Sequence, residues 1–226
     1  MPRQFRRFMG VALLDHRIRF PDPRRANPDG LVAVGGDLST ERLLLAYRSG
    51  IFPWTAAPVT WWSPNPRAIF ELEGLHLSHS LQKLIRKGSF RVTMDQAFPE
   101  VMKGCAAPGP GRRSTWITSE FLQAYTALHE QGHAHSLEVW REEELAGGIY
   151  GVVVGGLFAG ESMFHRASNA SKVAVFHLVE HLKAQGFQLF DIQMLTPITT
   201  KLGGVEISRE AYLRRLARAV EKACVF

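Results

Sequence analysis

Three apolar segments in the second half of the chain follow one another with only short polar or glycine breaks. They read AHSLEVWR (134–141), LAGGIYGVVV (145–154) and LFAGESMF (157–164). Apolar runs of this length, bounded by charged residues or glycines, are typical of β-strands. The chain is therefore predicted to form three successive strands here.

The segment after these strands has the spacing of a helix. Between Ser171 and Gln185 apolar residues recur at the intervals expected for one buried helical face, and Gly186 ends the pattern. A further strand is predicted over Gln188–Met194. A strand, a helix and a second strand favour a right-handed crossover, so this last strand is predicted to have a parallel neighbour.

Shorter helices are predicted elsewhere, at Thr40–Ser49, at Ser80–Lys87, from Thr118 or Ser119 to Gln131, and at Arg209–Lys222. The first 30 residues are rich in arginine and proline and are predicted to form an extended arm. The run FPWTAAPVTWWSPNPR (52–67) combines prolines with tryptophans and cannot be one regular element. A boundary in this run predicts a small N-terminal domain at 1–62 and a larger domain at 63–226.

Three polar side chains interrupt the apolar segments. Asp191 and Gln193 lie two residues apart in the last predicted strand, and Glu161 lies inside the third of the successive strands. Because side chains alternate between the faces of a strand, Asp191 and Gln193 are expected on one face, about 7 Å apart. An unpaired buried carboxylate is costly, so that face must contain a hydrogen-bond network or a cavity. An acidic pocket for a cationic ligand and a pair of satisfied structural acids are both open interpretations.

The charge of the chain suggests an anionic partner. Its 226 residues carry a formal net charge of +6, and no acidic residue lies between Leu75 and Val92. Within this stretch the predicted helix brings Lys83, Arg86 and Lys87 to one face, which would neutralise phosphates and make binding salt-dependent. A solvated basic surface explains the same pattern equally well.

Cysteine usage and hydropathy indicate the compartment. Cys105 and Cys224 are the only cysteines, which fits a reducing environment without a disulfide framework. The apolar run Phe8–Leu14 is too short for a secretory signal and is followed by charged residues. No segment approaches the roughly 20 apolar residues that cross a bilayer. A cytoplasmic protein without membrane contact is expected.

Two motifs have a chemical interpretation that their context does not favour. HLVEH (177–181) matches the H-x-x-E-H pattern of some zinc peptidases, but so short a pattern is common by chance, and surface or structural histidines are favoured. GCAAPGPGRRST (104–115) resembles a phosphate-binding loop, yet Pro110 stands where the lysine is required. Arg112 and Arg113 contacting phosphate is one interpretation of this loop, and a solvated basic loop is the other.

Nine segments together resemble the leucyl/phenylalanyl-tRNA–protein transferase family. They cover most of Asn27–Ile207, in the order NPDGLVAVGGDLS, RLLLAYRSGIFPW, WWSPNPRAIF, RVTMDQAF, STWIT, GHAHSLEVW, LAGGIYGVVVGGLFAGESMF, NASK and DIQ. The resemblance implies an α+β fold with a small N-terminal domain and a GNAT-like acyltransferase domain, whose mixed, mostly antiparallel sheet is flanked by helices. It also implies transfer of leucine or phenylalanine, and of methionine, from aminoacyl-tRNA to proteins that begin with Arg or Lys. The product is a degradation signal of the N-end rule pathway.

The resemblance assigns roles to individual residues. Asp191 and Gln193 match a catalytic D-x-Q pair, and Glu161 matches a carboxylate of the same pocket. The aromatic residues implied around the 3′-terminal adenosine and the peptide are Trp54, Tyr47, Trp116 and Tyr125. Those implied to shape the pocket for the amino-acid side chain are Phe158, Ile149 and Leu178, and the implied tRNA-binding face carries Lys83, Arg86 and Lys87. No cofactor or metal is implied, and a monomer is expected.

The sequence departs from the family pattern after the D-x-Q strand. Many relatives carry a histidine and a serine where this chain has Ile198 and Lys201, so the preference among leucine, phenylalanine and methionine stays open. The donor is an activated ester, so the reaction needs an oriented α-amine and no ATP. Gln193 is expected to accept a hydrogen bond from this amine, with Asp191 orienting Gln193 and Glu161 contacting the cationic end of the acceptor.

Two other functions fit some of the same features. A CoA-dependent N-acetyltransferase would share the implied fold, but VVVGGLFAGES lacks the Gln or Arg that opens the pyrophosphate loop of those enzymes. A non-catalytic RNA-binding protein would explain the positive charge and the aromatic residues, but it gains nothing from carboxylates among them. The transferase is therefore the predicted function.

Overall fold

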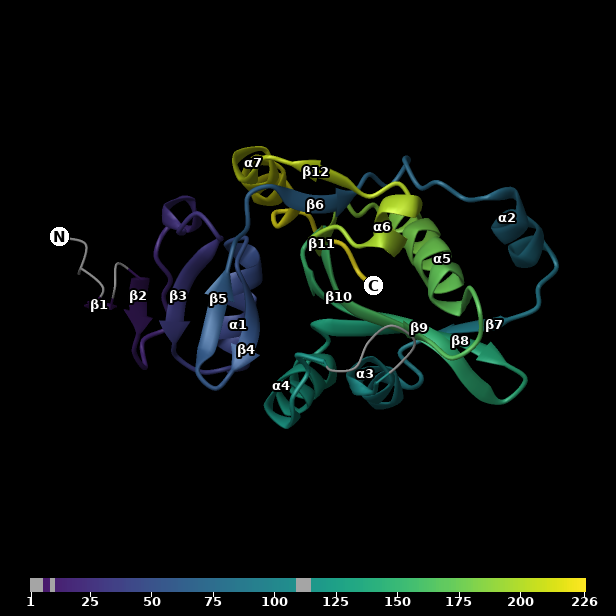
Figure 1. The fold of residues 1–226 in the computed structure, drawn as a ribbon, viewed down its shortest axis with the longest axis horizontal. Helices are drawn as coiled ribbons and strands as arrows, with labels where there is room; N and C mark the ends of the chain where they lie inside the picture. Colours follow the sequence, from purple (N-terminus) through teal and green to yellow (C-terminus); the bar gives the residue numbers. More distant parts are fainter. Residues whose placement is uncertain (1–5, 9–10, 109–114) are drawn as a thin grey trace.

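The computed structural model describes residues 6–8, 11–108 and 115–226, whose strands form two sheets (Figure 1). The first sheet has the strand order β1–β2–β3–β5–β4. Its strands are Arg6–Phe8 (β1), Val11–Leu14 (β2), Leu31–Gly35 (β3), Phe52–Ala56 (β4) and Val59–Trp62 (β5). A 3-10 turn at Pro23–Arg25 and helix α1, Thr40–Arg48, belong to the same part of the chain. The segment predicted as an extended arm therefore supplies two strands, because β3 offers β2 a parallel partner.

The second sheet is larger and mixed, with the order β12–β6–β11–β10–β9–β8–β7. Its strands are Arg67–Phe70 (β6), Arg91–Met94 (β7), Ala134–Arg141 (β8), Glu144–Val154 (β9), Leu157–His165 (β10), Leu189–Gln193 (β11) and Val205–Ile207 (β12). Every neighbouring pair is antiparallel except β10 and β11, which are parallel. The predicted mixed, mostly antiparallel sheet is confirmed.

Helices cover both faces of this second sheet. Helix α5 (Ala170–Ala184) lies on one face, while α3 (Phe98–Ala106) and α4 (Ser119–Glu130) lie on the other (Figure 1). The remaining helices are α2 (His79–Arg86), α6 (Pro197–Lys201) and α7 (Arg209–Ala219). The buried apolar residues form two clusters, one beneath α5 and one that joins α3 and α4 to the first sheet.

The sequence predictions for long, regular elements are confirmed to within a few residues. Strands β8, β9 and β10, helix α5 and the parallel partner of β11 all occur as expected. The run from 52 to 67 is not one regular element, as predicted: it contains the antiparallel strands β4 and β5 and the start of β6. We propose that the domain boundary lies at Ser63, between β5 of the first sheet and β6 of the second.

The parallel ladder between β10 and β11 positions the polar residues. Leu157–Ala159 pair with Leu189–Asp191, and the ladder ends there. Just beyond it, β10 shifts register against β9 between Gly160 and Ser162, and β11 shifts against β6 between Asp191 and Gln193. Bulges of this kind re-aim side chains. Glu161 and Gln193 consequently meet across the gap at the end of the ladder.

Across the described ranges, no helix is both long enough and apolar enough to span a bilayer. Arg112 and Arg113 fall within 109–114 and so lie outside the described residues.

Candidate active site

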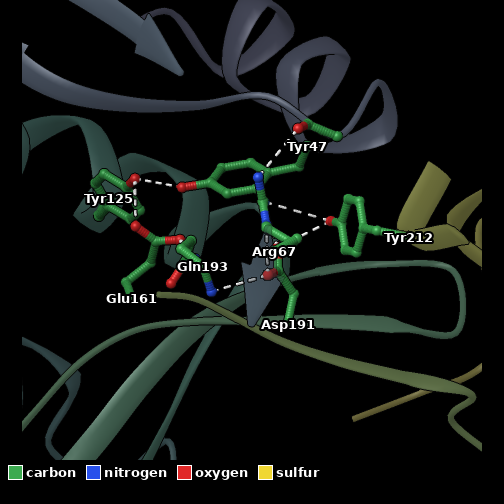
Figure 2. Close-up of polar contacts among 8 residues, drawn as sticks. Tyr47, Arg67, Tyr125, Glu161, Asp191, Gln193 and Tyr212 are labelled. Atoms are coloured by element: carbon green, nitrogen blue, oxygen red, sulfur yellow. Dashed lines mark hydrogen bonds and ion pairs between the residues drawn. The ribbon is translucent and has the colours of Figure 1, made fainter. Parts of the chain in front are cut away.

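Asp191 is fully buried, and four hydrogen bonds surround its carboxylate (Figure 2). Oδ1 accepts from Nε of Arg67 at 2.8 Å and from the backbone N–H of Gln193 at 2.9 Å. Oδ2 accepts from Nη2 of Arg67 at 2.6 Å and from the hydroxyl of Tyr212 at 2.9 Å. A carboxylate with all of these partners has no position left for a substrate. All hydrogen bonds of this carboxylate are therefore made within the protein.

Gln193 does not continue the strand geometry of Asp191. Its φ is 56°, in the left-handed region that non-glycine residues seldom occupy, and the register shift of β11 coincides with it. The regular strand geometry on which the predicted spacing of about 7 Å depended is therefore interrupted at Gln193. Asp191 instead accepts a hydrogen bond from the backbone of Gln193 and so helps to hold this unusual conformation.

The side chain of Gln193 is bonded to Glu161. Its Nε2 donates to Oε1 of Glu161 at 3.0 Å, which fixes which end of the amide is the carbonyl oxygen. No described residue donates to that oxygen. The amide is therefore oriented, with one acceptor available, and 8% of the residue is exposed.

Glu161 is half-buried and belongs to a chain of hydroxyl contacts. The hydroxyl of Tyr125 donates to its Oε2 at 3.2 Å, and the hydroxyls of Tyr125 and Tyr47 are in turn hydrogen-bonded to each other (Figure 2). Burial raises the pKa of Glu161 to about 8, although hydrogen bonds from Tyr47 and Tyr125 oppose the increase. The carboxyl group can thus gain or lose a proton near neutral pH.

Arg67 and Tyr212 complete the site, and neither was identified from the sequence. Arg67 is 1% exposed; its guanidinium lies 4.5 Å from the ring centroid of Tyr212 and 4.8 Å from that of Phe52. Burial alone would lower the Arg67 pKa, but the charge of Asp191 raises it above its ordinary value, so the guanidinium stays charged. Nη1 of Arg67 also donates to the carbonyl of Gly50, at the end of α1. Arg67 therefore links β6, β11, α7 and α1.

The predicted aromatic residues divide into two groups. Tyr47 and Tyr125 are 1% and 0% exposed, with their hydroxyls in the network around Glu161. Trp54 and Trp116 are half-buried; Trp54 contacts the ring of Trp62 edge-on at 5.2 Å, and Trp116 contacts Phe121 at 4.9 Å. Only the tryptophans keep exposed surface for a ligand to stack on.

The three residues predicted to line the side-chain pocket lie together, but in a different apolar cluster from the tyrosines. They are Phe158, Ile149 and Leu178. All three belong to the apolar cluster beneath α5, at 0–5% exposure, whereas Tyr47 and Tyr125 belong to the cluster on the side of α3 and α4. The ring of Phe158 contacts that of Phe190, the neighbour of Asp191, at 5.4 Å. The sheet therefore separates these apolar residues from the tyrosine pair.

The basic face predicted on α2 is present and exposed. Ser78 caps the helix with its side chain, and Lys83, Arg86 and Lys87 are all exposed to solvent. The side chain of Leu81 is buried and attaches the helix to the rest of the domain. The three cations are therefore free to meet a polyanion.

Two further features lie away from this network. A recess of about 480 Å³ between the first sheet and α4 is lined by Gly36, Asp37, Leu38, Ala56, Val59, Glu120, Gln123 and Ala124, none of which belongs to the network. His177 and His181 lie on α5, and burial lowers the pKa of both. In the described part of the chain, no group of three or more potential ligands could hold a metal ion.

Family models and individual relatives of this chain all point to one family of transferases. The family model described as leucyl/phenylalanyl-tRNA protein transferase matches residues 69–217, and the model for the N-terminal domain of that family matches 36–65. The chain is 52% identical over 202 residues to a leucyl/phenylalanyl-tRNA–protein transferase of Shewanella pealeana, covering 88% of this chain and 86% of the relative. It is 49% identical over 217 residues to one of Anaeromyxobacter dehalogenans, covering 95% and 93%.

The likeness to solved structures is much weaker. A GCN5-related N-acetyltransferase-like protein from Streptococcus suis aligns with 64% of this chain and 58% of its own, at 15% identity and a TM-score of 0.37.

Proposed function

The chain belongs to the leucyl/phenylalanyl-tRNA–protein transferase family and is an aminoacyltransferase; from this premise we propose its substrates and its reaction. The enzyme transfers leucine or phenylalanine, and also methionine, from aminoacyl-tRNA to the α-amine of proteins that begin with Arg or Lys. A peptide bond forms, and the new N-terminal residue marks the protein for degradation. A cytoplasmic location and a monomeric state are part of the same proposal.

The oriented amide of Gln193 is the observation that carries the reaction. Because Nε2 donates to Glu161, the carbonyl oxygen is left to accept a hydrogen bond from the acceptor amine and to aim its lone pair at the ester. An amide oxygen is not appreciably basic, so this contact orients the amine without deprotonating it. Glu161, bonded to the same amide, contacts the cationic end of the acceptor. Asp191 and Arg67 hold the backbone beneath them.

The proposed ligand contacts follow from exposure. Trp54 and Trp116 stack on the 3′-terminal adenosine or the peptide, because their rings are not fully enclosed. Tyr47 and Tyr125 are fully buried, so we propose that they act through Glu161. Phe158, Ile149 and Leu178 form the apolar surroundings of the leucine or phenylalanine side chain. Opening of the cluster beneath α5 would be required to admit that side chain, because these residues are buried.

The exposed cations of α2 are proposed to bind the tRNA body. Replacing Lys83, Arg86 and Lys87 together by alanine is expected to weaken aminoacyl-tRNA binding and to reduce the slope of log K against log salt by about 2–3, since each phosphate contact contributes roughly 0.7–0.9. Filter binding between 50 and 300 mM salt measures the slope. Transfer from a short aminoacyl-adenosine donor, which has no tRNA body, is the control and should be unchanged. An unaltered slope would show that α2 is only a solvated surface.

Transfer of labelled leucine tests the proposed function. The protein is mixed with radiolabelled Leu-tRNA and a peptide that begins with Arg, and the label is expected to move to the peptide. A matched peptide that begins with Gly should remain unlabelled. Label on neither peptide would contradict the proposal, and label on both would contradict the restriction to basic N-termini.

A further inference from the structure

Building on the proposed function, we propose that Glu161 is the proton shuttle of the reaction: it accepts a proton from the attacking nitrogen and returns it to the departing ribose oxygen. This role goes beyond contact with the cationic end of the acceptor. It makes Glu161 a general base in the first half of the reaction and a general acid in the second.

The geometry favours Glu161 over the other polar groups of the site. The carboxylate of Asp191 is fully enclosed by hydrogen bonds and paired with Arg67, so it is not accessible to a substrate. The amide of Gln193 does not take up a proton. Glu161 is a carboxylate and is half-buried, and the described groups that donate to it are neutral: Nε2 of Gln193 and the hydroxyls of Tyr125 and Tyr47.

The location of Glu161 also fits the path of the proton. Gln193 Nε2 lies 3.0 Å from Oε1 of Glu161, so an amine that donates to the carbonyl oxygen of the same amide is close to the carboxylate. The register shift in β10 places Glu161 just beyond the end of the β10–β11 ladder, beside the side chain of Gln193. One nitrogen can therefore meet both groups at once.

The pKa of Glu161 is suited to accepting a proton and returning it near neutral pH. The groups that face it are Tyr47 from α1, Tyr125 from α4, Asp191 from β11 and Arg67 from β6. Burial and the charge of Asp191 raise the pKa of Glu161, whereas the hydrogen bonds of the two tyrosines and the charge of Arg67 lower it. The resulting pKa is about 8. An α-amino group has a pKa of about 7.7–8.0. A fair fraction of the amine is therefore neutral and able to attack near pH 8, and a group that accepts and returns a proton is most effective when its own pKa lies near the working pH.

The reaction balances without another reactant. The neutral amine attacks the ester carbonyl carbon, a C–N bond forms, and the carbonyl oxygen becomes an oxyanion. Ionised Glu161 removes one proton from the now positively charged nitrogen. The oxyanion then re-forms the carbonyl, the bond between carbon and ribose oxygen breaks, and Glu161 gives its proton to that oxygen. The products are an amide, a free ribose hydroxyl and the original carboxylate.

The test is the pH dependence of Glu161→Gln, which keeps the size and hydrogen-bonding capacity of the side chain. Single-turnover transfer is measured from pH 6 to pH 9.5 with the wild type and the variant, beside aminoacyl-tRNA binding. The variant is expected to be about 100-fold slower at pH 9. The deficit should shrink about tenfold by pH 7, because the wild-type carboxylate is itself mostly protonated below its pKa of about 8.

Other outcomes would overturn the proposal. If the variant is slower than the wild type by the same factor at every pH, Glu161 is a positioning residue. If that factor increases toward acid pH, Glu161 binds the ammonium group instead of exchanging its proton. Absence of transfer by the wild type would instead refute the proposed function.

Tyr125→Phe gives a second measurement. Removing the hydroxyl that donates to the carboxylate should shift the ionisation of Glu161, and with it the pH profile of transfer, to higher pH. An unshifted profile in this variant would also contradict the proton shuttle.

Discussion

Replacing Arg67 by alanine is expected to lower the free energy of unfolding by about 3–5 kcal/mol, because it leaves a buried carboxylate without its cation. Asp191 and Arg67 are both at most 1% exposed and share two hydrogen bonds of 2.8 and 2.6 Å. The substitution also removes the contacts of the guanidinium with the rings of Tyr212 and Phe52. Equilibrium unfolding in urea, followed by fluorescence and circular dichroism, measures the loss.

Arg91→Ala is a matched control for this experiment. Arg91 also begins a strand of the second sheet and lies over an aromatic ring, that of Trp140, but its side chain is 49% exposed and its ion pair with Glu143 spans 3.9 Å. Its removal should cost at most about 1 kcal/mol. A similar small loss for Arg67→Ala would show that the buried pair contributes little.

A double variant separates the stability of the pair from its function. Arg67→Met combined with Asp191→Leu replaces both charges by apolar side chains, which is often neutral or stabilising. Much of the lost stability should return, while transfer should not, because the backbone N–H of Gln193 would lose its acceptor. Recovery of transfer together with stability would mean that Asp191 does not position Gln193.

The parts of the fold that could be predicted are those encoded locally. The strands from Ala134 to His165 and helix α5 are long, regularly patterned and separated by clear breaks, so each could be identified without knowledge of its partners. Strands β4–β6 were not recognised, since their prolines and tryptophans obscure any alternation and their pairing depends on β3 and β11.

The candidate site was only partly predictable for a similar reason. The sequence indicated that a carboxylate at Asp191 needs a partner, but 27 lysines and arginines were available. Arg67, 124 residues away, becomes that partner only through the register of β6 against β11. One signal was present: in RAIF, an arginine begins a short, wholly buried apolar strand. The left-handed conformation of Gln193 had no such signal, because a bulge arises from the pairing of two strands.

Replacing Gln193 by alanine is expected to lower kcat by roughly 100- to 1,000-fold while aminoacyl-tRNA binding is retained. The amide is oriented by Glu161, and its carbonyl oxygen is the proposed contact that aligns the amine for attack. Loss of a group that aligns reactants within about 1 Å, or that stabilises developing charge, has effects of this size. Single-turnover transfer gives the rate, and filter binding gives the affinity for aminoacyl-tRNA.

Gln193→Asn distinguishes the amide from the backbone that supports it. Alanine is less suited than asparagine to a φ of 56°, so Gln193→Ala combines loss of the amide with strain at the bulge. Asparagine accepts this backbone conformation and keeps the amide, but the shorter side chain draws it away from Glu161. If the position of the carbonyl oxygen is what matters, Gln193→Asn should lose most of the transfer activity with little loss of stability.

Gln188→Ala is the control. This residue is exposed and lies just before the same strand, so the variant should be as active as the wild type. Equal losses of transfer and of aminoacyl-tRNA binding in Gln193→Ala would assign Gln193 to donor binding instead of to alignment of the amine.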